Sequence, residues 1–308
     1  MQYLLLIIGF VLLIKGADFF VDGSSSTAKR LKVPSLIIGM TVVAMGTSLP
    51  ECAVSTTASA TQKNELAIAN IVGSNIFNLV AICGLCALLC PLVINKSTLI
   101  KEFPFSIFLA GLLLCFGLTG SSISRIEAII FLLIFAAFIF SMIRSAQKNR
   151  THANEEEYQL LPVWKCILFI VFGIAAIAVG GEMVVKSASR IARSFGMSDN
   201  LIGLTIVALG TSLPELVTSI VAAKKNEMDM ALGNVIGSNI FNILFVLGIA
   251  ASISPIAFIT ENVIDIILLI AMSIMVWLMC WKRKKLIRPH GVIMLLVYTG
   301  YVIYICNR

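Results

Sequence analysis

Residues 37–51 read IIGMTVVAMGTSLPE, and residues 201–215 read LIGLTIVALGTSLPE. A second pair of matching stretches follows, with AIANIVGSNIFN at residues 67–78 and ALGNVIGSNIFN at residues 231–242. Both pairs are separated by the same offset of 164 residues, so the two motifs keep the same spacing in each half. Self-similarity of this length at a fixed offset indicates an internal duplication.

The composition places this duplication in a membrane. Of the 308 residues, 59% are hydrophobic and only 13% are charged, and the mean hydropathy is +1.00. A soluble domain is about one-quarter charged, so an ordinary soluble protein is excluded, and a disordered chain has the opposite balance. A helix needs about 20 apolar residues to cross a bilayer. Ten stretches of this kind lie at 3–21, 34–60, 66–92, 103–120, 126–145, 162–185, 198–223, 229–252, 260–281 and 289–306.

The duplication divides the chain into a first repeat at 1–145, a short cytoplasmic linker at 146–161 and a second repeat at 162–308. Each repeat holds five apolar stretches, an odd number, so the second repeat must sit upside down relative to the first. Inverted repeats with interrupted helices near the midplane are typical of secondary transporters. The predicted fold is an all-α polytopic membrane protein with ten transmembrane helices in two inverted five-helix repeats, interrupted at an ion site.

Basic residues predict the orientation of these helices. With the N-terminus outside, 16 of the 23 Lys and Arg residues fall in inward loops, six fall in outward ones, and Lys15 lies in the first span. Inward loops of membrane proteins carry the excess of Lys and Arg, so both termini are expected outside. The net charge of +7 then follows from topology and does not require nucleic acid as a partner. The first stretch has no basic region before it and no evident cleavage site, so we expect it to remain as a span.

The second apolar stretch carries polar residues near its middle, Thr47, Ser48 and Glu51. A carboxylate at this depth is costly and indicates a functional site. An isolated hydroxyl would more simply be a helix-packing residue, but this glutamate recurs in register within an identical GTSLPE motif. Residues three and four apart share one helical face, so the three side chains converge. Pro50 lacks an N–H and is expected to kink the helix and free backbone oxygens of residues 44–46.

The other motif copies supply matching groups. Ser74 and Asn78 stand four apart, as do Ser238 and Asn242, while the asparagines between them are expected to face elsewhere and hold the backbone. All of these groups are hard oxygen donors, which suits calcium and sodium and offers no thiolate or imidazole to zinc or copper. The side chains predicted as cation ligands are those of Glu51, Glu215, Thr47, Thr211, Ser48, Ser212, Asn78, Asn242, Ser74 and Ser238.

The doubled GTSLPE and GSNIFN motifs resemble those of the cation/calcium exchanger superfamily, and most of all prokaryotic sodium/calcium exchangers, over essentially the whole chain. The resemblance implies two alpha repeats in which glutamates bind calcium in alternation with sodium. Calcium would be held by Glu51 and Glu215 with oxygens of Thr47 and Thr211. The resemblance places sodium at Ala44, Ser48, Ser74, Ala208, Ser212 and Ser238, with Asn78 and Asn242 at the centre.

The sequence departs from the family pattern in two places. Some members carry Asp at the position of Asn242, and Asn here leaves the sodium stoichiometry and any potassium coupling open. The linker has no room for the large calcium-sensing insert of animal exchangers. Proton-coupled relatives usually have a different acidic motif, which weighs against proton coupling.

The function predicted from these features is a secondary antiporter that exports calcium in exchange for sodium by alternating access. A proton- or potassium-coupled cation antiporter and a cation channel are the alternatives. An intramembrane enzyme is disfavoured because the only histidines, His152 and His290, lie in or beside loops and leave Ser48 and Ser212 without a base. The expected setting is the plasma membrane, in bacteria the inner membrane. The expected partners are the lipid bilayer and the calcium and sodium ions, with no cofactor and no obligate protein partner.

Overall fold

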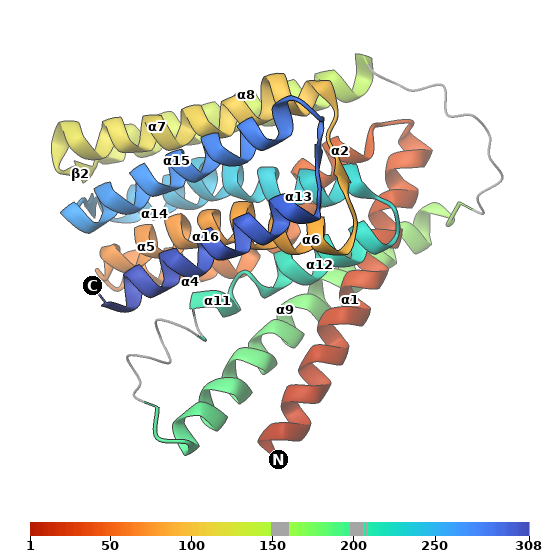
Figure 1. The fold of residues 1–308 in the computed structure, drawn as a ribbon, viewed down its shortest axis with the longest axis horizontal. Helices are drawn as coiled ribbons and strands as arrows, with labels where there is room; N and C mark the ends of the chain where they lie inside the picture. Colours follow the sequence, from red (N-terminus) through yellow and green to blue (C-terminus); the bar gives the residue numbers. More distant parts are fainter. Residues whose placement is uncertain (149–159, 198–205, 207, 308) are drawn as a thin grey trace.

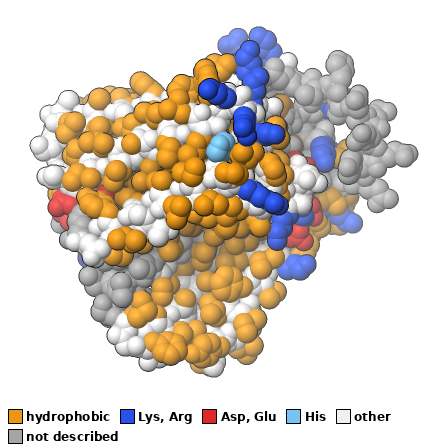
Figure 2. All heavy atoms as spheres, in the orientation of Figure 1, with side chains coloured by type: hydrophobic (Ala, Val, Ile, Leu, Met, Phe, Trp, Pro, Cys, Tyr) orange, Lys and Arg blue, Asp and Glu red, His pale blue; other side chains and the backbone are white. Residues whose placement is uncertain are grey.

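The computed structural model describes residues 1–148, 160–197, 206 and 208–307. In these residues the backbone is almost entirely helical, with four strands of two residues each (Figure 1). No water satisfies the backbone inside a bilayer, so a chain that faces lipid has to form helices. Large apolar side chains cover much of the visible face, as a lipid-facing surface requires (Figure 2). The predicted linker at 146–161 lies mostly outside the described residues.

The first repeat folds into long helices, three of which contain a π-helical turn (η). Its elements are α1 (Gln2–Leu31), α2 (Ser35–Ile38), η1 (Gly39–Val43), α3 (Ala44–Thr47), α4 (Leu49–Ala60), α5 (Asn64–Ile76), η2 (Phe77–Ile82), α6 (Cys83–Leu89), β1 (Leu92–Val93), η3 (Thr98–Glu102), α7 (Phe103–Gly120), β2 (Ser122–Ile123) and α8 (Arg125–Lys148).

The second repeat follows the same order in its described residues, except that η3 has no counterpart. Its elements are α9 (Val163–Ser194), α11 (Ala208–Gly210), α12 (Leu213–Lys224), α13 (Met228–Phe241), η5 (Asn242–Val246), α14 (Leu247–Ile253), β3 (Ile256–Ala257), α15 (Thr260–Trp281), β4 (Lys285–Leu286) and α16 (Arg288–Asn307). Eight helices of the described residues are long and apolar enough to cross a membrane, or up to nine if the bent helix at 35–60 is one span. The seventh predicted stretch, 198–223, lies partly outside the described residues.

The second predicted span is a broken helix. Its two parts, residues 35–47 and 49–60, are bent by 49° at Ser48, where φ is −85° and ψ is 12°. The sequence predicted a kink caused by Pro50, and the break falls two residues earlier. Pro50 lies in the first turn of α4, where its missing N–H has no helical partner to lose. The proline therefore starts a new helix rather than bending a continuous one.

The α1 and α9 helices form a closely packed pair, seen side by side below the other helices in Figure 1. A Cβ atom added to Gly180 of α9 would lie 2.7 Å from the Leu13 backbone nitrogen and 2.8 Å from the Gly9 carbonyl oxygen of α1. Only glycine permits this approach, and small residues at such a contact are how helices associate in lipid. The end of the molecule where α1 ends and α9 begins is called the linker end below.

Two short sheets link the halves of the chain. In one, β1 pairs antiparallel with β4, and Leu92 lies opposite Leu286. In the other, β2 pairs antiparallel with β3, and Ile123 lies opposite Ile256. Each sheet takes one strand from each repeat, so loops of the first repeat are hydrogen-bonded to loops of the second.

Candidate functional site

The helix breaks place four polar side chains in the protein interior. Ser48 and Glu51 follow the break between α3 and α4, and Ser212 and Glu215 follow the corresponding break between α11 and α12. Both glutamates and Ser48 are completely buried, and Ser212 is 1% exposed. A buried carboxylate requires hydrogen-bond donors or cations near it, because burial removes its hydration. Its partners therefore decide what the site can do.

Each carboxylate is held by a serine from the other repeat. Ser48 Oγ donates to Glu215 Oε1 at 2.7 Å, and Ser212 Oγ donates to Glu51 Oε1 at 2.9 Å. The two contacts are reciprocal under the offset of 164 residues. The four predicted side chains therefore meet in one place, which the sequence alone could not establish.

Four asparagines interlock the other motif copies in the same reciprocal way. Asn75 Nδ2 donates to the Asn239 carbonyl oxygen at 3.3 Å, and Asn239 Nδ2 donates to the Asn75 carbonyl oxygen at 3.1 Å. Their side-chain oxygens accept from Asn242 Nδ2 at 3.1 Å and from Asn78 Nδ2 at 3.3 Å, respectively. Asn75 and Asn239 thus hold the opposite backbone and at the same time fix how Asn78 and Asn242 lie.

Six buried oxygens at this site have no hydrogen-bond partner among the described residues. They form three pairs under the offset of 164 residues, and each pair contributes the same atom from both repeats. An unpaired buried polar atom is costly, so these six oxygens are available to accept a ligand. All are oxygens, the ligand type of calcium and sodium. These atoms are Glu51 Oε2, Glu215 Oε2, Ser74 Oγ, Ser238 Oγ, Asn78 Oδ1 and Asn242 Oδ1.

Ala44 and Ala208 were expected to supply backbone oxygens as ligands, and the structure describes them less completely than the side-chain ligands. The Ala44 carbonyl oxygen accepts a backbone hydrogen bond from Ser48 N at 3.0 Å. The Thr47 hydroxyl lies 3.3 Å from the same oxygen, but its single proton has a nearer acceptor in Asn234 Oδ1 at 3.1 Å. The Ser48 bond uses one of the two lone pairs of this oxygen and leaves the second open to a cation. Ala208 starts α11, and its side chain lies outside the described residues.

Two asparagines that the sequence did not single out hydrogen-bond to the backbone of the two glutamates. Asn234 Nδ2 donates to Ser219 Oγ at 2.9 Å and to the Glu215 carbonyl oxygen at 3.3 Å, and its Oδ1 accepts from Thr47 Oγ1 at 3.1 Å. Asn70, its counterpart in the first repeat, accepts from Thr211 Oγ1 at 3.4 Å. The signal that could have revealed them is present, because both occupy the same position within the repeated motif.

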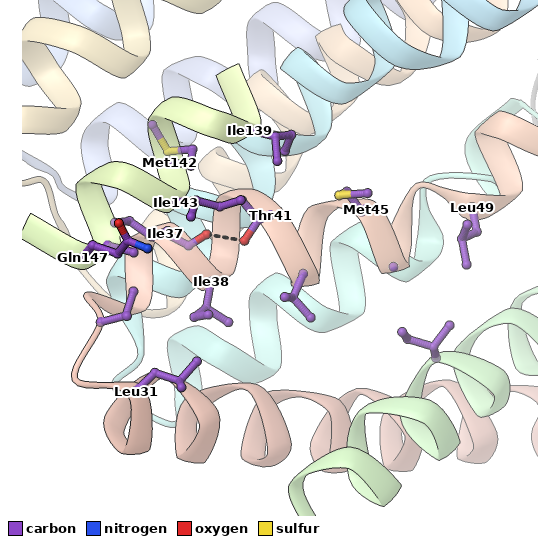
Figure 3. A pocket seen from close by; sticks show the side chains of 15 residues that line it. Leu31, Ile37, Ile38, Thr41, Met45, Leu49, Ile139, Met142, Ile143 and Gln147 are labelled. Carbon is purple, nitrogen blue, oxygen red and sulfur yellow. Dashed lines mark hydrogen bonds between the residues drawn. The ribbon is translucent and has the colours of Figure 1, made fainter. Parts of the chain in front are cut away.

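A cavity of about 660 Å³ lies beside the broken helix and is separate from the candidate site (Figure 3). Residues of η1, α3 and α8 line it, and apart from Thr41 and Gln147 nearly every lining side chain is apolar. The Thr41 hydroxyl donates to the Ile37 carbonyl oxygen at 2.7 Å. No carboxylate lines this cavity, and its mostly apolar lining does not suit a cation.

Comparison with known proteins identifies the family of this chain. A family model described as "Sodium/calcium exchanger protein" matches residues 1–144 and 165–307. The chain belongs to the sodium/calcium exchanger family. The resemblance inferred from the GTSLPE and GSNIFN motifs is thereby confirmed, and the exchanger is a membrane transporter and not an enzyme.

Relatives of this exchanger match it over nearly their full length. It is 40% identical to the putative antiporter CaxA of Alkalimonas amylolytica, over 96% of this chain and 95% of that protein. It is 33% identical to the sodium/calcium exchanger MaX1 of Methanosarcina acetivorans, over 98% of this chain and 97% of that one. A solved structure of the sodium-calcium exchanger NCX_Mj, soaked with zero Na⁺ and Ca²⁺, superposes with a TM-score of 0.86 at 30% identity and covers 99% of this chain and 98% of its own.

Proposed function

We propose that this exchanger moves calcium out of the cell in exchange for sodium, with calcium held between Glu51 and Glu215. Sodium–calcium antiport follows from the family, while the direction and the ligands are our proposal. The observation that carries the proposed site is the set of six unpartnered oxygens, which come in equal numbers from both repeats and include one oxygen of each reciprocally bonded carboxylate. A divalent cation would neutralise both carboxylates and satisfy these oxygens together.

The proposed ligands divide between the two ions. Calcium would take Glu51 and Glu215 with oxygens of Thr47 and Thr211. Sodium ions would occupy places around the calcium position, where each needs fewer charged ligands. Their proposed ligands are Ala44, Ser48, Ser74, Ala208, Ser212 and Ser238, with Asn78 and Asn242 between them.

We place this site in a molecule of ten transmembrane helices, arranged as two inverted five-helix repeats with both termini outside. Support comes from the reciprocal contacts, which match residue for residue under one offset. Lys and Arg side chains gather toward the linker end on the visible face, which fits a linker in the cytoplasm (Figure 2). The proposed location is the plasma membrane, in bacteria the inner membrane.

The proposed exchange needs no cofactor and no obligate protein partner, because the sodium gradient supplies the driving force. A reconstitution experiment tests the function. Liposomes that contain the full chain are loaded with sodium and diluted into sodium-free buffer with calcium-45. Calcium uptake is expected to saturate with calcium and to stop when choline replaces the internal sodium. Uptake without any counter-ion would indicate a channel, and uptake driven by a proton or potassium gradient would indicate a different coupling ion.

A further inference from the structure

A charged cluster joins α1 to the turn between α12 and α13, outside the candidate ion site. Lys225 Nζ lies 2.6 Å from Asp18 Oδ1 and 2.7 Å from Asp22 Oδ1. Only 28% of the Lys225 side chain is exposed, so water screens these pairs less than it screens pairs on an open surface. Burial lowers the pKa of Lys225, but the hydrogen bonds and charges of the two aspartates outweigh this effect and raise its pKa above the ordinary lysine value. The lysine therefore stays charged and is shared by two carboxylates of α1.

A second set of contacts continues the cluster toward the linker end. Glu227 accepts a hydrogen bond from Ser25 Oγ, and its Oε1 lies 3.4 Å from Lys29 Nζ. A cavity of about 430 Å³ separates these residues from Leu160 and Leu161, which precede α9. The turn after α12 thus holds α1 through ion pairs at two successive levels.

The corresponding positions of the other repeat have different chemistry. At the offset of 164 residues, the two aspartates correspond to Glu182 and Lys186, which pair with each other along α9. The lysine corresponds to Thr61, whose hydroxyl donates only to carbonyl oxygens of its own helix. Within the described part of the chain, no ion pair joins α9 to the turn at residues 61–63. Among the described residues, the tie between a long helix and the turn beside it is therefore found for α1 and not for α9.

This asymmetry matters because the ion site itself is symmetric. Reciprocal ligands give the two sides of a carrier nearly equal access to the same groups, so any preference between its two conformations has to come from elsewhere in the molecule. The α1 and α9 helices pack on each other through glycines, and α1 also packs against α12. A tie from α1 to the end of α12 resists their separation at the linker end.

We propose that Asp18, Asp22 and Lys225 form a one-sided latch that favours the conformation closed at the linker end. The exchanger without ions then presents its site mainly to the opposite side. This inference rests on the proposed exchange of calcium for sodium, because only a carrier with two access states has such a preference. The latch would open each time the site turns toward the linker end.

The latch predicts a difference between the two sides in apparent affinity. When the conformation that binds from one side is the minor one, only a fraction of the molecules can bind from that side. The apparent affinity from that side equals the intrinsic affinity multiplied by this fraction. Removal of the latch raises that fraction. Calcium affinity from the linker end should then tighten by about two- to fivefold, the effect expected from ion pairs that are partly exposed to solvent. Affinity from the opposite side should weaken by less than about twofold, since its conformation stays well populated.

The decisive variant is Lys225→Thr, which introduces the residue that the first repeat carries at the equivalent position. Initial rates of calcium-45 transport are measured from each side in proteoliposomes of known orientation. The matched control is Lys186→Thr, which breaks only the pair within α9 and should leave both affinities unchanged. A charge exchange, Asp22→Lys with Lys225→Asp, should restore the difference between the sides. If Lys225→Thr left the ratio of the calcium affinities from the two sides unchanged, or changed both affinities equally, the latch would be overturned.

Hydrogen–deuterium exchange separates failure of the latch from failure of the proposed function. In ion-free wild type, residues 18–30 of α1 should exchange more slowly than the equivalent residues 182–194 of α9. Lys225→Thr should abolish this difference, and the charge exchange should restore it. If the wild type showed no sodium-driven calcium flux, the proposed function would fail. Equal exchange in the two wild-type segments would refute the latch whatever the flux.

Discussion

Two buried carboxylates, each hydrogen-bonded by a serine from the opposite repeat, dominate the chemistry of this molecule at the scale of single residues. Glu51 and Glu215 each use one oxygen for that serine and leave the other without a partner among the described residues. The pair carries a charge of about −2 in its ionised form, and a divalent cation balances it without excess. A neutral side chain of the same shape would remove the charge and keep the hydrogen-bonding geometry.

Replacement of either carboxylate by an amide, Glu51→Gln or Glu215→Gln, is therefore expected to abolish calcium transport. Apparent calcium affinity should fall by more than about 100-fold, because loss of groups that only support a metal ligand already weakens binding by 10- to 100-fold. Calcium-45 uptake driven by a sodium gradient measures the effect. Glu65→Gln, on an exposed turn of α5, is the control and should transport normally. Wild-type uptake by either site variant would remove these glutamates from the site.

Protons should compete with calcium at the same two carboxylates. Calcium binds the ionised pair, and protonation of Glu51 or Glu215 removes the charge that attracts it. Apparent calcium affinity should consequently fall as the pH falls from about 7.5 to about 5.5, and the loss should be reversible. Competition binding with calcium-45 at constant ionic strength measures it. A flat affinity over that range would show that the two glutamates do not share a calcium ion.

At the scale of elements, glycines determine how closely the long helices pack. Gly180→Ala should destabilise the exchanger by about 1–3 kcal/mol, because the added methyl meets the backbone of α1 at Leu13 and Gly9, which cannot move aside. Gly111→Ala, in the middle of α7, meets nothing within 4 Å and should be neutral or stabilising by up to about 1 kcal/mol. Thermal unfolding in detergent compares the two variants. Equal melting temperatures would mean that the contact between α1 and α9 is looser than described.

The sequence predicts these elements well where a local pattern encodes them. Apolar length locates the spans, and the repeated GTSLPE motif locates the break in the second one. The exact break at Ser48 was not predicted, because a proline two residues later can either kink a helix or start one, and tertiary packing decides between them. The reciprocal serine–carboxylate contacts and the pairing of Lys225 with α1 join residues more than 160 positions apart, and no local pattern encodes such contacts.

At the scale of the whole molecule, charge balance predicts electrogenic exchange. With Asn at both 78 and 242, one calcium ion neutralises the two glutamates, whereas three sodium ions leave the site with a charge of +1. The membrane potential should then accelerate the sodium step and barely affect calcium–calcium exchange, because a charge that crosses the field gains about 2.3 kcal/mol per 100 mV. Proteoliposomes with a potassium diffusion potential set by valinomycin measure both modes.

Two outcomes would contradict this balance. Sodium–calcium exchange that ignores the potential would mean that two sodium ions replace one calcium. Calcium–calcium exchange that follows the potential would mean that another charged group moves with the site. The variant Asn242→Asp tests the same charge count. Its added carboxylate makes the net charge of the occupied site depend on whether that carboxylate is protonated.

The interlocked asparagines also bear on how such a chain could have arisen. In the contacts of Asn75 and Asn239, each half offers the other the same donor and the same acceptor. This is the isologous pattern of a two-fold homodimer, in which one surface is complementary to itself. A single unduplicated half, made as a separate polypeptide, would already possess both sides of this interface. Gene fusion would then have added a linker to a working pair, and only afterwards could substitutions such as Lys225 make the two halves unequal.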